Sequence, residues 1–229
     1  MDGNRLQNFP LYKQFLTAFV AACALAGAGS AVLAQKGSTM IAIGKMDVGK
    51  APADFEFGRT GQGGTGQWVV THDASATGGY AIEQTNTDPT GYRFPLAIFK
   101  LVSAKNIDVS LRFKAVAGHV DQAGGIALRL TDPDNYYVVR ANALEDNVRF
   151  YRVSNGRRVQ IAGKDTKVSG NEWHALGLKA EGGNFIVMFD DKELYRATDN
   201  SISAAGRIAL WTKADSVTRF DRIEISPLR

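Results

Sequence analysis

Apolar and polar residues alternate along most of the second half of the chain, most clearly from Gly124 to Ile161. In this segment, short runs such as Ile126–Leu130 and Tyr136–Asn142 place apolar side chains at every second position. Alternation over about four to eight residues is typical of strands that bury one face. Turn formers separate the runs, and one of these turns is Asn155 with Gly156, a pair that accepts the positive φ angles of a tight hairpin. The segment therefore predicts four consecutive antiparallel strands.

The same pattern continues on both sides of this segment. Thirteen strand-like runs lie between Gln67 and Ile225, an earlier one lies around Phe55–Phe57, and no stretch has the periodicity of an ordinary helix. So many strands exceed one ordinary sheet, and two packed antiparallel sheets are the economical arrangement. We therefore predict an all-β fold, a two-sheet antiparallel sandwich at residues 53–229. The pattern is weaker before it, and residues 35–52 are expected to form a flexible N-terminal segment.

Residues 1–34 have the organisation of a secretory signal peptide. Arg5 and Lys13 precede an apolar run that ends in a small-residue cleavage site at Ala34. We expect export, to the periplasm or out of the cell, with cleavage after Ala34 and no membrane span afterwards. A second interpretation is a lipoprotein signal, in which Cys23 is lipidated and anchors the protein to a membrane.

Cleavage leaves 195 of the 229 residues and lowers the net charge from +4 to +3. A domain of this size buries roughly 70% of its unfolded surface, so it needs no metal or disulfide to fold. Because Cys23 is the only cysteine, the mature chain contains no thiol. This excludes a disulfide framework, a thiol nucleophile and a thiolate zinc site. The positive charge is too small and dispersed to indicate nucleic acid as a partner, although it suits acidic glycans or surfaces.

The polar sides of the predicted strands gather arginines. If Ile126, Leu128 and Leu130 face the core, then Arg129 faces the opposite way, and the following strands place further polar residues on that side. The predicted polar face consists of Arg129, Arg140, Asn142, Arg149, Tyr151 and, from a later strand, Trp211. Guanidinium groups bind hydroxyl and carboxylate oxygens, and a large ring stacks on the apolar side of a sugar. We expect a saccharide-binding face here, and the alternative is a solvated outer face without a ligand.

Several stretches of the chain resemble the concanavalin A-like jelly-roll superfamily. They are GIALR at 125–129, DPDNYYVVR, EWHALGLKAEGGNFIVMFDDKEL, GRIALW and FDRIEI. Within the superfamily the chain is most similar to the secreted 3-keto-disaccharide hydrolase domain, over roughly residues 53–226, and it is also related to laminin-G-like modules. The resemblance implies an exported jelly-roll domain that works in carbohydrate processing.

The resemblance also implies a reaction. A 3-keto group acidifies the neighbouring C2 proton of the sugar, so one base and one electrophile suffice to eliminate the glycosidic oxygen. The candidate bases are His119, Asp121 and Glu145, and the candidate electrophiles are Arg129 and Arg140.

Two departures from the family pattern weigh against catalysis. Ala123 and Gly124 stand where members with the hydrolase activity tend to have Asn-Ser, and the Glu-x-Asp-x-Glu strand of related glucanases is missing. An ordinary glycosidase needs two carboxyls about 5–10 Å apart around one bond. The adjacent acidic residues of this chain, such as Glu145 with Asp146, lie in predicted turns, where they serve turn geometry.

Evidence for a metal is weak. Asp132 and Asp134 offer oxygen ligands suited to calcium, but they belong to a proline-containing turn that also explains them. The sequence requires no cofactor, and a divalent cation such as calcium is the one candidate. We therefore predict an exported domain that binds a saccharide or polysaccharide. The alternatives are a 3-keto-glycoside hydrolase or lyase of the same fold and an envelope protein-interaction module.

Overall fold

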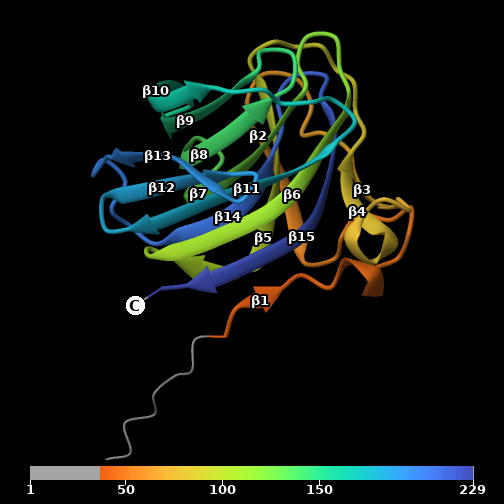
Figure 1. Cartoon of the computed structure of the whole chain (residues 1–229), viewed down its shortest axis with the longest axis horizontal. Helices are drawn as coiled ribbons and strands as arrows, with labels where there is room; N and C mark the ends of the chain where they lie inside the picture. Colours follow the sequence, from red (N-terminus) through yellow and green to blue (C-terminus); the bar gives the residue numbers. More distant parts are fainter. Residues whose placement is uncertain (1–36, 229) are drawn as a thin grey trace, which may run out of the picture. The chain divides into compact units, whose positions relative to one another are not determined.

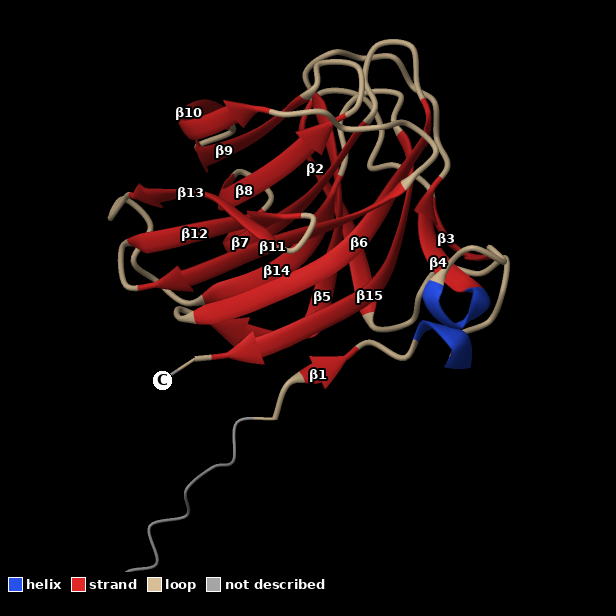
Figure 2. Cartoon of the chain, viewed as in Figure 1, coloured by secondary structure: helices blue, strands red, loops and turns tan. Residues whose placement is uncertain are grey.

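A computed structural model describes residues 37–228 of the chain, in which two antiparallel sheets pack face to face (Figure 1). Helix is confined to two short turns, η1 (Ile43–Lys45) and η2 (Thr77–Gly79), drawn in blue in Figure 2. Neither helix found within the described residues has the length and apolar character needed to cross a membrane. The predicted signal peptide and Cys23 lie outside the described residues.

One sheet has eight strands. They are β1 (Thr39–Met40), β3 (Trp68–His72), β4 (Tyr80–Gln84), β6 (Ile107–Ala117), β11 (Trp173–Glu181), β12 (Asn184–Phe189), β13 (Lys192–Thr198) and β15 (Val217–Pro227). Their order in the sheet is β13-β12-β11-β6-β15-β4-β3, and β1 pairs with β15 outside this path.

The other sheet has seven strands. They are β2 (Phe55–Gly61), β5 (Arg93–Ala104), β7 (Ala123–Asp132), β8 (Asn135–Asn142), β9 (Asn147–Ser154), β10 (Arg157–Asp165) and β14 (Gly206–Trp211). Their order is β10-β9-β8-β7-β14-β5-β2, so the four strands predicted from Gly124 to Ile161 are consecutive neighbours. Asn155 and Gly156 both have positive φ at the β9–β10 turn, as the hairpin prediction requires.

A single apolar core fills the space between the sheets. The seven-stranded sheet contributes inward side chains such as Ile126, Val139 and Phe150, and the eight-stranded sheet contributes others such as Leu111 and Phe220. All five are almost fully buried. The predicted all-β, two-sheet sandwich is therefore confirmed.

The segment before β2 differs from the expectation of a flexible leader. Thr39 pairs with Ile225 of β15, and Met40 pairs with Glu224. Ile41 and Ile43 then enter the core with exposed fractions of 7% and 6%. Gly and Ala between these apolar residues obscured the short pattern in the sequence. Part of residues 37–52 is thus built into the sandwich.

A bulge in β7 changes the predicted alternation. Arg129 adopts a φ of 51°, and the register between β7 and β8 shifts between Leu128 and Asp132. As a result Leu128 faces the core between the sheets, whereas Leu130 belongs to a second apolar cluster on the other side of the sheet. The prediction that Ile126, Leu128 and Leu130 share one side is therefore wrong for Leu130.

Candidate functional site

The outer face of the seven-stranded sheet, which points away from the other sheet, carries its own apolar cluster. We call it the aromatic face. Its buried residues come from five neighbouring strands and are Phe94, Leu96, Ile98, Ala123, Ala127, Leu130, Tyr136, Val138, Tyr151, Val153, Ala209 and Trp211. An outer face of this kind is unusual, because antiparallel sheets commonly leave one side polar and solvated.

The seven-stranded sheet curves strongly, and the aromatic face lies on the inside of the curve. Thr60 of β2 and Tyr136 of β8 have their hydroxyl oxygens 2.6 Å apart, although four strand spacings, about 19 Å in a flat sheet, separate their strands. The hydroxyl of Tyr92, just before β5, donates to the carbonyl of Gly156 at 2.8 Å and accepts the backbone N–H of Arg158 at 3.0 Å. These contacts join distant strands across the aromatic face and bury much of it.

Trp211 lies on the aromatic face but is not accessible. It is fully buried. Its ring stacks on Phe94 with centroids 5.2 Å apart. Its indole N–H donates to the hydroxyl of Tyr136 at 3.2 Å. The expectation that Trp211 offers a stacking platform to a sugar does not fit this burial, because the curvature of the sheet closes over the ring.

Arg140 is the centre of a polar group on the same face. Its guanidinium bonds the carboxylate of Glu145 at 2.6 Å and the hydroxyl of Tyr151 at 3.2 Å, and it also donates to the side-chain oxygen of Asn147. The Arg140 side chain is only 4% exposed, whereas that of Glu145 is 40% exposed. The Nε donor of Arg140 is buried and has no hydrogen-bond partner among the described residues. Glu145 is thus the accessible end of an otherwise buried pair.

Lys213, just after β14, links this pair to a second carboxylate. Its ammonium contacts Asp121 and lies 3.7 Å from Glu145. Asp121 also accepts a hydrogen bond from the side-chain amide of Asn142, which is fully buried. The sequence prediction brought Arg140, Asn142 and Tyr151 to one face correctly but omitted Lys213. We call Arg140, Glu145, Lys213, Asp121, Asn142 and Asn147 the charged cluster.

The two carboxyls of the charged cluster have opposite environments. Burial raises the pKa of Asp121, and this outweighs the lowering effect of Lys213. Burial acts in the same direction on Glu145, but the charges of Arg140 and Lys213 and hydrogen bonds from Asn147 and Arg140 lower its pKa. Asp121 is only 1% exposed, so Glu145 is the carboxylate of this pair that a ligand can reach.

The carboxylate of Asp215 holds the loop that carries Asp121. Asp215 accepts the backbone N–H groups of His119, Val120 and Asp121 at 2.6–3.1 Å. Burial alone would raise the pKa of Asp215, but these N–H groups lower it. His119 itself is exposed and meets Asp215 through its backbone. The candidate base His119 is therefore a loop residue at the margin of the charged cluster.

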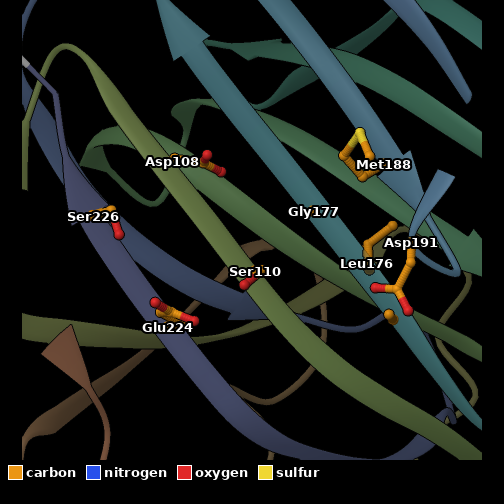
Figure 3. Close-up of a pocket in the computed structure, with 9 residues that line it drawn as sticks. Asp108, Ser110, Leu176, Gly177, Met188, Asp191, Glu224 and Ser226 are labelled. Carbon is orange, nitrogen blue, oxygen red and sulfur yellow. The ribbon is translucent and has the colours of Figure 1, made fainter. Parts of the chain in front are cut away.

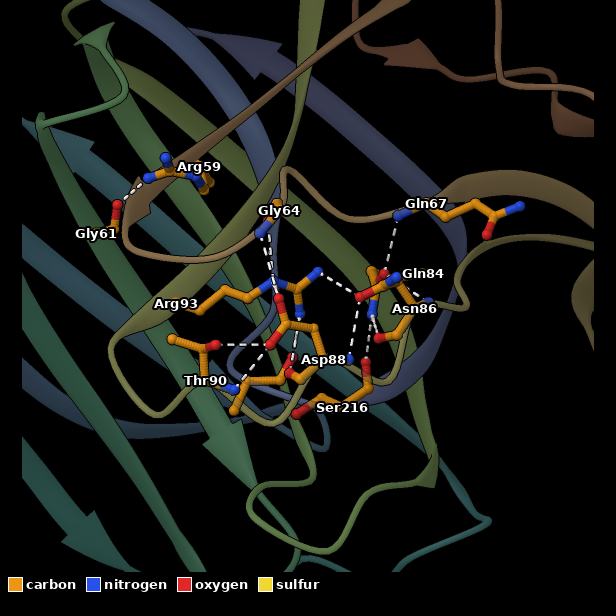
Figure 4. Close-up of polar contacts among 11 residues, drawn as sticks. Arg59, Gly61, Gly64, Gln67, Gln84, Asn86, Asp88, Thr90, Arg93 and Ser216 are labelled. Carbon is orange, nitrogen blue, oxygen red and sulfur yellow. Dashed lines mark hydrogen bonds and ion pairs between the residues drawn. The ribbon is translucent and has the colours of Figure 1, made fainter.

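Arg93, at the start of β5, ties several loops together, and Figure 4 shows its contacts with Gly64 and Asn86. It is fully buried. Its guanidinium donates to the carbonyls of Gly64 and Ala214 at 2.8 and 2.5 Å and to the side chain of Asn86 at 2.9 Å. Because Ala214 follows Lys213 directly, this buried arginine fixes the backbone from which the lysine extends.

Arg158 is a member of the aromatic face that the sequence analysis missed. It pairs with Val153 across the β9–β10 hairpin, and Val153 faces outward. Its guanidinium lies 4.3 Å from the ring centroid of Tyr151 and 4.8 Å from that of Phe94. The register of the Asn155–Gly156 turn would have put Arg158 on the same side as Tyr151, so the signal was present in the sequence.

Of the other two predicted arginines, Arg129 lies elsewhere, whereas Arg149 shares the predicted face opposite Arg140. Arg129, turned inward by the bulge, donates to the carbonyls of Lys105, Ile202 and Gly182 and is 1% exposed. Arg129 therefore joins three connections between strands, and it neither shares the predicted face nor contacts Glu145. Arg149 is on the outer side of β9, but it pairs with Asp165 at the edge strand at 2.5 Å.

The calcium candidates form a turn. One carboxylate oxygen of Asp132 accepts the backbone N–H of Asp134 at 2.7 Å and the side-chain amide of Asn135 at 3.0 Å. Within residues 37–228 no three metal-binding side chains of the His, Cys, Asp or Glu type come together. A role for calcium stays a prediction without support from these contacts.

The outer face of the eight-stranded sheet contains an open groove of about 340 Å³, shown in Figure 3. It lies over β6, β11, β12 and β15 and is lined by Asp108, Ser110, Ala175, Leu176, Gly177, Met188, Asp191, Glu224 and Ser226. Burial raises the pKa of Asp108, and the neighbouring carboxylates of Glu224 and Glu181 act in the same direction. The groove is acidic and has no aromatic side chain in its lining.

Farther along this face the charged residues are paired. Asp73 contacts Lys114 and Arg219, and Asp221 binds Arg112 at 2.5 Å. Arg112 and Lys114 also lie 4.8 and 5.0 Å from the ring centroid of Trp173. Trp173 is only partly buried because it points outward from β11.

Comparison with known proteins gives a family and a fold. Residues 104–228 match the family model of the galactocerebrosidase C-terminal lectin domain. None of the curated proteins matches the chain in sequence.

The solved structures that are similar to the chain include three proteins from Bacillus species. They are the carbohydrate-binding module CBM66 from Bacillus subtilis (22% identity, TM-score 0.58, 70% of this chain and 91% of the module), a protein of unknown function with a galectin-like fold from Bacillus subtilis (8%, 0.54, 77% and 91%), and a Bacillus licheniformis β-glucanase (12%, 0.52, 80% and 96%). At these identities the similarities concern the fold alone. The concanavalin A-like jelly roll expected from the sequence is confirmed, whereas nothing in these matches points specifically to a 3-keto-disaccharide hydrolase.

Proposed function

The chain belongs to the family of galactocerebrosidase C-terminal lectin domains, and from this we propose that it binds a saccharide on the outer face of its seven-stranded sheet. The contact surface consists of the accessible side chains there, namely Glu145, Lys213 and Arg158, beside the largely buried ring of Tyr151. The structural neighbour with the highest TM-score of the three above is itself a carbohydrate-binding module. Family and fold therefore favour the same class of ligand.

The observation that carries the proposal is the charged cluster beside aromatic rings. Carbohydrate hydroxyls need both donors and acceptors. The charged cluster offers Glu145 as an acceptor and Lys213 as a donor, and Arg158 on the neighbouring rings is a further donor. Arg140 orients Glu145 through a bond of 2.6 Å, and Tyr151 supplies an aromatic edge beside it. Preorganised polar groups on an otherwise apolar surface are typical of small-molecule sites.

The exposure and the partners of the two carboxylates in the charged cluster favour binding over hydrolysis. Two-carboxylate hydrolysis needs both groups at the bond, but Asp121 is 1% exposed and engaged by Lys213 and Asn142. The 3-keto elimination needs only one base beside an electrophile, and Glu145 next to Arg140 is the remaining pair of that kind. A hydrolase or lyase acting on 3-keto-glycosides is thus the second candidate function. A protein-interaction module is the third.

The test uses a panel of neutral and acidic polysaccharides cast into native gels, with retardation of the mature chain as the measurement. We expect retardation by at least one polysaccharide and its loss, by about tenfold in affinity, in Glu145→Gln, because a charge-assisted hydrogen bond to the ligand is removed. The matched control is Glu193→Gln. Glu193 also bonds an arginine, Arg196, at 2.6 Å, but on β13 of the other sheet.

Mass spectrometry of the same panel, with 3-keto-disaccharides added, separates binding from catalysis. Intact saccharides together with retardation support the binding module. Cleavage that disappears in Glu145→Gln supports the enzyme instead. Equal retardation of wild type, Glu145→Gln and Glu193→Gln would contradict this site for either function.

We also propose that the protein is exported with cleavage after Ala34. The argument is the order of Arg5, Lys13, the apolar run and the small-residue site. Expression of the full chain in a bacterium, followed by intact-mass analysis, should give a chain that begins at Gln35. A mass that fits a lipid-modified Cys23 at the N-terminus would instead support the anchored form, and an uncleaved chain would contradict both.

A further inference from the structure

We propose that the saccharide bound by this domain is acidic and that Arg158 binds its carboxylate or sulfate group. This inference rests on the proposed function, since it names the chemistry of the ligand at the same face. A guanidinium is always charged. The partners of each arginine in the domain therefore show whether its positive charge is neutralised.

Most arginines of the domain that are partly buried reach a carboxylate or a set of carbonyls. Arg112 binds Asp221, Arg152 binds Asp199, and Arg219 binds both Asp73 and Glu83. These pairs satisfy the fork of the guanidinium and neutralise its charge. Arg129 is instead bound by three backbone carbonyls. Arg93 combines backbone carbonyls with the side chain of Asn86 and lies 3.5 Å from the carboxylate of Asp88.

Arg158 has neither kind of compensation. Its guanidinium rests on the rings of Tyr151 and Phe94, at 4.3 and 4.8 Å from their centroids. Its Nη1 is buried and has no hydrogen-bond partner. The rings hold the side chain in one place, since a cation over an aromatic face is attracted electrostatically. Arg158 is only partly buried, and its Nε and Nη2 groups also have no hydrogen-bond partner among the described residues, so these are the donors that an acceptor can reach. A guanidinium with open donors in a preset position suits a planar carboxylate or a sulfate.

Charge on the rest of the aromatic face is already balanced. Arg140 is neutralised by Glu145, and Lys213 by Asp121. Arg158 therefore adds one uncompensated positive charge. A partly desolvated charge without a counter-ion is costly, and an anionic ligand would remove that cost, whereas a neutral sugar would not.

A second arginine lies in the same patch. The Arg140 guanidinium bonds the hydroxyl of Tyr151, whose ring also lies under Arg158. Its Nε is buried and has no partner among the described residues, and its charge is already paired with Glu145. Arg158 is therefore the arginine beside this tyrosine that can bind an anionic group.

The test compares three groups of polymers in affinity gels: carboxylated (polygalacturonate and alginate), sulfated (carrageenan) and neutral (levan, galactan and β-glucan). We expect retardation by a carboxylated or sulfated polymer, a loss of about tenfold or more in Arg158→Gln, and an intermediate loss in Arg158→Lys, which keeps the charge without the fork. The matched control is Arg157→Gln, because Arg157 is exposed, lies next to Arg158 on β10 and points to the opposite side. Thermal unfolding of each variant checks that it is folded.

Each outcome decides the inference. Which acidic group is retained distinguishes a carboxylate from a sulfate. If Arg157→Gln weakens retardation as much as Arg158→Gln does, the attraction is a general effect of charge and the inference fails. If only neutral polymers are retained, the ligand is not acidic and the inference fails while the proposed function stands. If no polymer of the three groups is retained, both are contradicted.

Discussion

The outer faces of the two sheets use the same kinds of side chain but pair them differently. On the eight-stranded sheet, Arg112 binds Asp221, while Lys114 and Arg219 share Asp73. On the seven-stranded sheet, Arg158 lies on two rings with an unpaired N–H, and Arg140 keeps an unpaired Nε. A closed network stabilises the fold, whereas a partly exposed guanidinium held on two rings without a carboxylate partner among the described residues is available to a ligand.

The charged groups that a ligand can reach also differ between the two faces. The groove of the eight-stranded sheet presents the carboxylates of Asp108, Asp191 and Glu224 without an aromatic side chain. The aromatic face presents cations beside rings. The acidic groove would repel an acidic saccharide, whereas the aromatic face would attract it. We therefore expect substitutions on the two faces to affect binding differently.

The largest expected effect concerns the aromatic face itself. Trp211→Ala removes a fully buried ring that stacks on Phe94 and bonds Tyr136. Large-to-small changes of this kind cost about 3–5 kcal/mol. Chemical denaturation should therefore show a loss of this size, with saccharide binding lost as the face collapses. A loss below about 1 kcal/mol would contradict the view that this outer face is a second core.

The next effect concerns the closed network of the opposite face. Arg112→Ala leaves the fully buried carboxylate of Asp221 with only the backbone N–H of Thr77. Breaking a pair around a buried charge should lower the free energy of unfolding by about 2–3 kcal/mol, while binding of the saccharide stays unchanged. The matched control is Arg149→Ala. Arg149 has the same 2.5 Å contact distance, but its partner Asp165 is 83% exposed, so the expected change is below about 1 kcal/mol.

The smallest effect concerns the loop beside the charged cluster. The pKa of Asp215 is lowered in the folded protein by the N–H groups of the His119–Asp121 loop, although burial opposes this. Its ionised form therefore stabilises the fold above the ordinary carboxyl pKa, and this contribution is lost as pH falls through the lowered folded value. Asp215→Asn should cost about 1–2 kcal/mol at pH 7, and the difference from wild type should shrink as pH falls below the ordinary carboxyl pKa of about 4. A difference that does not change with pH would contradict the ionic origin of this contribution.

The sequence predicted the fold well because strand alternation is a local property. The runs within β7–β10 and the Asn155–Gly156 turn were sufficient to place Arg140, Asn142 and Tyr151 on one face. The same turn fixes the register of β10, so Arg158 could have been placed there too.

The errors came from features that only tertiary structure decides. Arg129 turned inward because β7 bulges where it meets Gly206; a Cβ at Gly206 would lie 2.4 Å from the carbonyl carbon of Arg129. Trp211 was expected to be open because nothing in the alternation reveals that strands four positions apart touch across the sheet. A bulge and a curvature both depend on which strands become neighbours, and no window of sequence contains that information.

The most direct test of the central claim, that the aromatic face binds the ligand, is a two-dimensional NMR titration. Backbone amides of the mature chain would be followed while a short oligomer of the retained polysaccharide is added. We predict shifts concentrated in β8, β9 and β10 and in the loops that carry Glu145 and Lys213. Shifts concentrated instead in β6, β11 and β15, around the acidic groove, would contradict the account.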